Sequence, residues 1–177
     1  MRKIIYYVAS SIDGYIAGPN DDVEGYIAEG NGTEKYQSDL KGFDTVIMGR
    51  STYEYGYKFG IKPGQPSYAN MKHYVFSDRL HFEDPHPDVY TRPIDLQAIT
   101  DIKNQPGTDI YLCGGGQFAG WLLDHGHIDV LKIKLSPLIM GSGTRIFGTS
   151  SRKYKADLIA TEQYDKGLQI TTFAIRY

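Results

Sequence analysis

The stretch of residues 109–124 carries the clearest pattern of residues able to bind a charged ligand. It reads DIYLCGGGQFAGWLLD. The mostly apolar residues 110–113 predict a strand, the three glycines at 114–116 a tight turn, and the apolar positions 118, 121 and 122 a helix with one buried stripe. A helix that begins behind glycines leaves backbone N–H groups uncovered at the positive end of its dipole. The pattern therefore predicts a phosphate or pyrophosphate site, with a purely structural turn as the alternative.

The glycine turn matches only part of a dinucleotide-binding fingerprint. Gly114, Gly116 and Ala119 satisfy the spacing G-x-G-x-x-G/A. The complete Rossmann pattern also needs an acidic residue about 20 positions further on, at the end of the next strand. Here the next strand ends in Ser136-Pro137, and no acidic residue stands there to bind a ribose hydroxyl.

A second unit of the same kind follows the short apolar strand predicted at residues 45–48. Gly49 and Arg50 come next, and Ser51 and Glu54 have the S-x-x-E spacing of a capping box, which predicts a helix that begins at Ser51. Two strand, glycine and helix units at one end of a parallel sheet can hold both ends of a dinucleotide. The planar fork of an arginine suits phosphate at such a position.

Further candidate ligand contacts follow other predicted strands. Ser77 and Arg79 come after the strand predicted at 74–77 and could contact the adenosine end of a cofactor, while Asp78 between them would resist a 2′-phosphate unless it turns away. In the segment 136–148, two glycines and Thr144 allow close backbone approach to a ligand.

Two carboxylates are candidates for the substrate side. Asp13 precedes Gly14 after the first strand, where aspartate is usually a turn former and otherwise a polar group that points at a ligand. Glu34 lies on a short helix that Thr33 is expected to cap and that runs through Lys41. It could reach a substrate, although a first-turn carboxylate is already explained by the helix dipole.

Composition excludes several classes of function. The chain has 177 residues, a net charge of −2 and a single cysteine. It is long enough for one domain with a sizeable core. The absence of a basic excess argues against nucleic acid or an anionic membrane as a partner. No apolar run reaches the length of a membrane span and no cleavage-site pattern follows the N-terminus, so we expect a cytoplasmic protein. The histidines at 81 and 86 lie among prolines in a polar loop and indicate no metal site.

The order of predicted elements indicates an α/β fold. Strands are expected at residues 3–10, 45–48, 74–77, 89–91, 110–113 and 129–135, with helices between several of them, and a terminal hairpin at 155–164 and 168–177. The segment between Asp13 and Asn20 is expected to be a loop folded over the end of the sheet. The sheet should be mostly parallel with an antiparallel end.

Five motifs in order resemble a known family. They are SSIDGYIA at 10–17, VIMGRSTYE at 46–54, VFSDR at 75–79, YLCGGGQF at 111–118 and SPLIMGSGTRIFG at 136–148. Together they resemble the dihydrofolate reductase-like fold, and most closely the reductase domain of bifunctional riboflavin-biosynthesis deaminase-reductase proteins. The resemblance implies a three-layer α/β/α domain over residues 1–177 with a central sheet of about eight strands. The H-x-E and P-C-x-x-C pattern of a deaminase is absent.

The resemblance also implies a function. The expected protein is a stand-alone, NADPH-dependent reductase of a small heterocyclic substrate, cytoplasmic and homodimeric, similar to 5-amino-6-(5-phosphoribosylamino)uracil reductase. The alternatives are a dihydrofolate or pteridine reductase and a nucleotide-binding module without turnover. The residues implied on the substrate side are Asp13 and Glu34. Those implied to bind the cofactor are Ala9, Ile16, Gly49, Arg50, Ser51, Thr52, Ser77, Arg79, Gly114, Gly115, Gly116, Gln117, Phe118 and Thr144.

Overall fold

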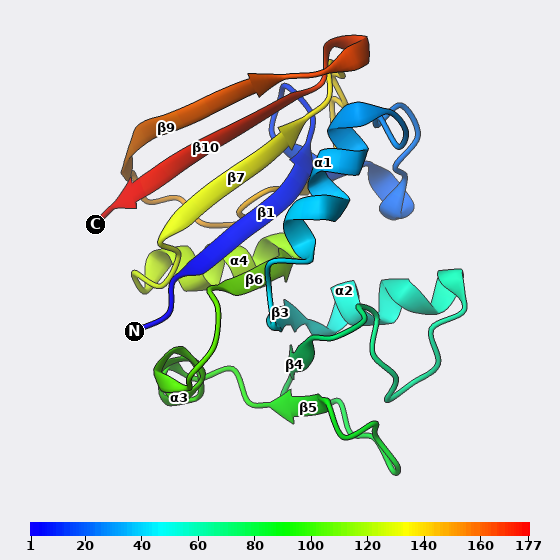
Figure 1. The fold of residues 1–177 in the computed structure, drawn as a ribbon, viewed down its shortest axis with the longest axis vertical. Coiled ribbons are helices and arrows are strands. Elements are labelled where there is room, and N and C mark those ends of the chain that lie inside the picture. Colours follow the sequence, from blue (N-terminus) through cyan, green and yellow to red (C-terminus); the bar gives the residue numbers. More distant parts are fainter.

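The computed structural model describes all residues from 1 to 177 and is built on one eight-stranded sheet (Figure 1). The strand order is β5-β4-β3-β6-β1-β7-β10-β9. The strands are β1 Ile4–Ser10, β3 Thr45–Gly49, β4 Lys72–Phe76, β5 Val89–Arg92, β6 Ile110–Gly114, β7 Val130–Leu135, β9 Lys155–Gln163 and β10 Gln169–Arg176. The first six are mutually parallel, and β10 runs antiparallel to both β7 and β9. The predicted α/β fold with an antiparallel C-terminal hairpin is confirmed.

Four α-helices cover the two faces of the sheet. They are α1 Asn31–Leu40, α2 Arg50–Tyr55, α3 Leu96–Asn104 and α4 Gly116–Asp124; three short 3₁₀ turns lie at Pro19–Asp21, Gly56–Phe59 and Asp165–Gly167. Successive side chains of a strand point to opposite faces. Tyr6 of β1 therefore joins the core cluster under α3 and α4, whereas Tyr7 joins the cluster under α1 and α2. This is the predicted three-layer arrangement. None of the four helices has both the length and the apolarity needed to cross a bilayer.

Two predicted helix starts are wrong. The first helix begins at Asn31 behind Gly30, and the N–H of Thr33 already donates to the Gly30 carbonyl at 3.0 Å, so Thr33 lies inside the first turn instead of capping it. The second helix begins at Arg50 behind Gly49, and no side chain caps it. The S-x-x-E pattern misled because Glu54 pairs with Arg50 and not with the helix end. Asp95, in contrast, caps α3 as its spacing suggests, since its carboxylate accepts from the Ala98 N–H at 2.8 Å.

The segment expected to be a loop over the end of the sheet contains a short strand. Residues Tyr15–Ala17 form β2 and pair with β8, Thr144–Arg145, in a separate two-stranded ribbon. Backbone hydrogen bonds extend this contact, from the Ile12 N–H to the Leu138 carbonyl at 2.8 Å and from the Ile146 N–H to the Gly14 carbonyl at 3.0 Å. Two connections that are far apart in sequence are thus joined above the carboxyl ends of the strands.

Truncation of Leu122 tests the packing of α4 on the sheet. Leu122 is fully buried in the larger core cluster. We expect Leu122→Ala to lower the free energy of unfolding by about 2–5 kcal/mol, because it removes buried methyl groups and leaves a cavity. Urea unfolding measures the change. Ile139→Ala is the matched control, since Ile139 is 73% exposed and should change the value by no more than about 0.5 kcal/mol. Equal effects of the two substitutions would contradict this packing.

Candidate functional site

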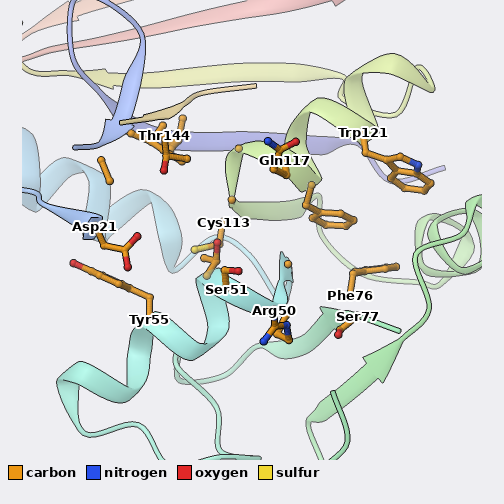
Figure 2. A pocket seen from close by; sticks show the side chains of 18 of the residues that line it. Asp21, Arg50, Ser51, Tyr55, Phe76, Ser77, Cys113, Gln117, Trp121 and Thr144 are labelled. Carbon is orange, nitrogen blue, oxygen red and sulfur yellow. The ribbon is translucent and has the colours of Figure 1, made fainter. Parts of the chain in front are cut away.

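A cavity of about 770 Å³ opens at the carboxyl ends of the central parallel strands (Figure 2). Its wall includes Ala9 from β1, Gly49 from β3, Ser77 directly after β4 and Cys113 from β6. Ligands of open α/β sheets bind outside the carboxyl ends of the strands, and small-molecule pockets occupy roughly 300–1,000 Å³. Position and size therefore both make this cavity the candidate site.

The structure brings most of the predicted cofactor-binding residues together in this cavity. Thirteen of the fourteen line it: Ala9, Ile16, Gly49, Arg50, Ser51, Thr52, Ser77, Arg79, Gly115, Gly116, Gln117, Phe118 and Thr144. Gly114 is the exception. It comes directly before the lining residues Gly115 and Gly116 and forms the turn. Its φ of +135° is one that residues with a side chain rarely adopt. Residues from five separate segments of the chain thus form one continuous surface.

The glycine turn after β6 leaves an uncapped helix end against the cavity. The N-cap of α4 is Gly115, no side chain caps it, and the Ala119 N–H makes an intrahelical bond to the Gly115 carbonyl at 2.9 Å. Gly116, Gln117 and Phe118 lie in the first turn and line the cavity. Backbone N–H groups at such a helix end bind anions. The turn is also structural, because a Cβ on Gly116 would overlap the carbonyl oxygen of Arg145.

One end of the cavity has an aromatic wall. The rings of Phe76 and Phe118 stack with centroids 4.8 Å apart, and Trp121 continues the stack at 6.1 Å from Phe118. Ile94 lines the same cavity and is 42% exposed. Figure 2 shows Phe76, Ser77 and Trp121 at the same end of the pocket. Trp121 and Ile94, the more exposed members of this wall, offer an apolar surface to a flat ring system.

Two arginines of the cavity wall differ in their partners. Arg50 forms an ion pair with Glu54 at 3.1 Å, one turn along α2. The Arg79 guanidinium has no carboxylate partner, and its backbone N–H donates to the Ser77 hydroxyl at 3.1 Å. Asp78 remains on the cavity wall, where its carboxylate accepts from the Ile94 N–H at 3.3 Å. The cation free to bind an anion at the aromatic end is therefore Arg79.

The opposite end contains residues that sequence reasoning missed. Asp21 and Tyr55 line the cavity and lie next to each other in Figure 2. Lys58 joins them, since its ammonium lies 3.4 Å from the Asp21 carboxylate and 4.9 Å from the centroid of the Tyr55 ring. Val23, Ile94 and Trp121 also line the wall without having been predicted there. Trp121 could have been found only by asking which side of its helix faces the strand ends.

The two carboxylates expected on the substrate side do not line the cavity. Asp13 accepts hydrogen bonds from the Ser11 hydroxyl at 2.6 Å, the Met140 N–H at 3.0 Å and the Gly141 N–H at 2.7 Å. It thereby fastens the 11–14 turn to the segment that follows β7. Glu34 is exposed in the first turn of α1. Any catalytic role of either residue stays a prediction.

Comparison with known proteins identifies the family. A family model described as the RibD C-terminal domain matches residues 2–170. The chain belongs to this family. The uncharacterized protein YwjB of Bacillus subtilis (strain 168) is 30% identical over 174 residues, which covers 96% of each chain. Sequence motifs alone had already suggested this family, and the match over nearly the whole chain confirms it.

Solved structures share the fold. A putative riboflavin biosynthesis protein from Shewanella sp. PV-4 superimposes with a TM-score of 0.83 at 22% identity and covers 100% of both chains. Dihydrofolate reductase from Enterococcus faecalis, solved with NADP(H) and RAB-propyl, gives a TM-score of 0.62 at 14% identity, covering 99% of this chain and 97% of that one. The dihydrofolate reductase-like fold is thereby confirmed.

Asp13→Asn tests the role of Asp13 as an anchor. The hydrogen bond from the Ser11 hydroxyl and the two backbone donors lower the pKa of Asp13 to about 2. Because this pKa lies below the ordinary value, the contribution of the carboxylate is fully present above about pH 4 and is lost as pH falls through about 2. We expect the variant to speed amide exchange at Gly141 at neutral pH, as measured by NMR. Asp101→Asn, on α3, serves as the control and should leave this amide unchanged.

Proposed function

We propose that this protein is a stand-alone NADPH-dependent reductase that transfers a hydride to a small heterocyclic substrate. Membership of the RibD C-terminal domain family supports a reductase of the riboflavin-pathway type. The observation that carries the proposal is one cavity with an apolar aromatic wall and an unpaired arginine at one end and an uncapped glycine turn in its wall. NADPH carries the matching groups in the same order: a flat adenine ring, a 2′-phosphate and a pyrophosphate.

The residues present fit NADPH. An adenine ring would lie against the aromatic wall at Trp121 and Ile94, and Ser77 and Arg79 would bind a 2′-phosphate. The first turn of α4 and the hydroxyls of Ser51 and Thr52 would bind the pyrophosphate, because backbone N–H groups and hydroxyls donate to phosphate oxygens. Ala9 and Ile16 would border the nicotinamide. Thr52 stands close to the glycine turn, since its Oγ1 lies 2.9 Å from where a Cβ on Gly115 would be.

NADPH, when bound, supplies the hydride. The protein orients the bound molecules and provides an apolar surface that excludes water. Val8, Ala9 and Ile16 form an apolar surface beside the predicted nicotinamide position and exclude water there. Cys113 lies in the same wall, but burial raises the pKa of its thiol, so the thiolate of a covalent catalyst is disfavoured. The geometry favours direct transfer between bound molecules over a covalent intermediate.

The alternatives make different predictions. A dihydrofolate or pteridine reductase would need a carboxylate beside the pterin. Glu34, the nearest candidate in sequence, is exposed outside the cavity wall, and Asp21, which does line the cavity, is paired with Lys58. A nucleotide-binding module without turnover would bind NADPH but would not oxidise it with any heterocycle. Loss of NADPH absorbance in the presence of a heterocycle panel distinguishes a reductase from such a module. In that assay, Asp13→Asn would lower kcat without changing the NADPH affinity if Asp13 takes part in turnover.

Arg79→Ala tests the cofactor assignment. We expect the variant to bind NADPH about 10- to 100-fold more weakly, because a hydrogen bond to a charged group contributes about 1.5–3 kcal/mol. Its NADH affinity should stay nearly unchanged, because NADH has no 2′-phosphate. Nicotinamide fluorescence titrations measure both affinities.

Asp78→Asn is the matched variant for Arg79→Ala, since both residues lie on the same cavity wall. Removal of the negative charge should strengthen NADPH binding and leave NADH binding nearly the same. Equal losses of both nucleotides in Arg79→Ala would place Arg79 away from the 2′-phosphate. Absence of binding of either nucleotide to the unmodified protein would overturn the proposed function itself.

We also propose that the protein is a homodimer that associates through β9. This nine-residue strand forms one edge of the sheet, and its Leu158 and Ile159 are 62% and 58% exposed. An exposed edge strand with apolar side chains is a template for pairing with a second chain.

A double substitution tests the dimer. We expect the unmodified protein to sediment at twice the chain mass of 19.9 kDa and Leu158→Lys/Ile159→Lys to sediment as a monomer, because buried unpaired charges oppose association. Analytical ultracentrifugation gives both masses. The control is Ile139→Lys, an exposed position outside β9, which should remain dimeric. A monomeric unmodified protein contradicts this proposal without affecting the cofactor assignment.

A further inference from the structure

Gln117 is the only residue with a side-chain amide on the wall of the cavity. It stands in the first turn of α4, beside the uncapped backbone N–H groups, and it is exposed. Figure 2 shows its side chain among those that line the pocket. An amide carries one acceptor oxygen and two donor N–H groups. What Gln117 can offer a ligand therefore depends on which end of the amide is already in use.

The oxygen of this amide is bound from outside the cavity. The Thr149 hydroxyl donates to Gln117 Oε1 at 3.1 Å. Thr149 follows β8 in the chain and does not itself line the cavity. No group of the chain forms a hydrogen bond with the amide nitrogen. Because Thr149 uses the acceptor, the two N–H donors of Gln117 are left for a ligand.

Gly148 restricts the same amide from a second side. A Cβ on Gly148 would lie 2.8 Å from Cδ and 2.9 Å from Oε1 of Gln117, so the backbone of Gly148 packs directly against the amide. The φ of Gly148 is +54°, in the left-handed region that favours glycine. Packing on one side and a hydrogen bond on the other leave this glutamine few alternative rotamers. The amide is thus oriented before any ligand arrives.

The segment that carries Thr149 is fastened to both ends of α4. Next to Thr149, the Ser150 hydroxyl donates to the carboxylate of Asp124 at 2.6 Å. Asp124 is the last residue of α4, whereas Gln117 lies in its first turn. Two adjacent hydroxyl residues thus bind opposite ends of one helix. Only the contact of Thr149 reaches a residue of the cavity wall.

We propose that Thr149 is a positioning residue of the nucleotide site, which holds Gln117 so that its amide nitrogen donates to a pyrophosphate oxygen. This inference rests on the proposed function, in which the first turn of α4 binds the pyrophosphate of the cofactor. The amide adds a donor to the backbone N–H groups at that helix end. Thr149 strengthens binding without touching the ligand, because a side chain that is already ordered loses less freedom on binding.

Substitution of Gln117 tests the donor. Gln117→Met should weaken NADPH and NADH binding by the same factor, about tenfold, since both nucleotides carry the same pyrophosphate and lose one hydrogen bond to a charged group. Gln117→Glu keeps an acceptor for Thr149 but turns a negative charge toward the phosphates, so it should weaken binding more than Gln117→Met does. Nicotinamide fluorescence titrations measure both affinities. Unchanged affinity in Gln117→Glu, or a loss confined to NADPH, overturns the inference.

A double-mutant cycle tests the role of Thr149. Thr149→Val should weaken NADPH binding about 2- to 10-fold, as expected when one side chain must be ordered on binding. Thr149→Ser keeps the hydroxyl and should bind NADPH like the unmodified protein. In the Gln117→Met background, Thr149→Val should have no further effect, because Thr149 acts only through the amide. A double variant in which the two losses multiply overturns the positioning role.

Ser150→Ala is the matched control. Ser150 fastens the same segment to the same helix, but at Asp124, which does not line the cavity. This variant should lower the melting temperature and leave NADPH affinity unchanged. Thr149→Val should do the reverse, since Thr149 is exposed and its substitution should cost little stability. If Ser150→Ala weakens NADPH binding as much as Thr149→Val does, the whole segment is responsible and the inference is overturned.

The inference and the proposed function fail in different experiments. An unmodified protein that binds neither NADPH nor NADH contradicts the proposed function. An unmodified protein that binds NADPH, with the same affinity in Thr149→Val, contradicts only the positioning role of Thr149 and leaves the cofactor assignment standing.

Discussion

The close contact between α4 and residues 145–147, which lie at the end of β8 and just after it, is the constraint on which the site depends. At Gly116 and Gly120 a Cβ would overlap the carbonyl oxygens of Arg145 and Phe147. Only glycine allows the helix and this segment to approach so closely. The approach places Thr144 over the first turn of α4, and the pairing of β8 with β2 then holds Ile16 and Ala17 against the cavity. One steric fact at the helix therefore determines the position of both connections above the strand ends.

The central strand β1 gives the two sides of the molecule different chemistry. Tyr6 points toward α4 and donates its hydroxyl to the Ile146 carbonyl at 3.0 Å, so it supports the segment over the cavity. Tyr7 points toward α1, packs edge-on against Tyr36 with ring centroids 4.8 Å apart, and reaches Asp39 with its hydroxyl. Because side chains alternate along a strand, two adjacent tyrosines serve two layers. Ala9, two residues beyond Tyr7, belongs to the α1 side and also lines the cavity.

The sequence predicted the site best where glycine turns follow apolar strands. Glycine turns behind apolar strands identified Gly49 and the 114–116 turn, because parallel strands all end on one edge and their turns converge there. Helix starts were predicted less well. The capping-box spacing at Ser51 and Glu54 could not be told from an i,i+4 ion pair between Arg50 and Glu54, since both place an acid in the first turns of a helix. Asp21 and Val23 carry no local signal, as their place in the cavity follows from long-range contacts of an irregular segment.

Charge placement in this chain is local and not a property of its composition. The net charge is −2, yet two cations have no carboxylate partner: Arg79 after β4, on the cavity wall, and the buried Lys134 on β7. Since β4 and β7 are separated in the sheet by β3, β6 and β1, the two positive charges flank opposite ends of the row of strands whose carboxyl ends form the wall. The order of the strands itself thus keeps these two positive charges apart.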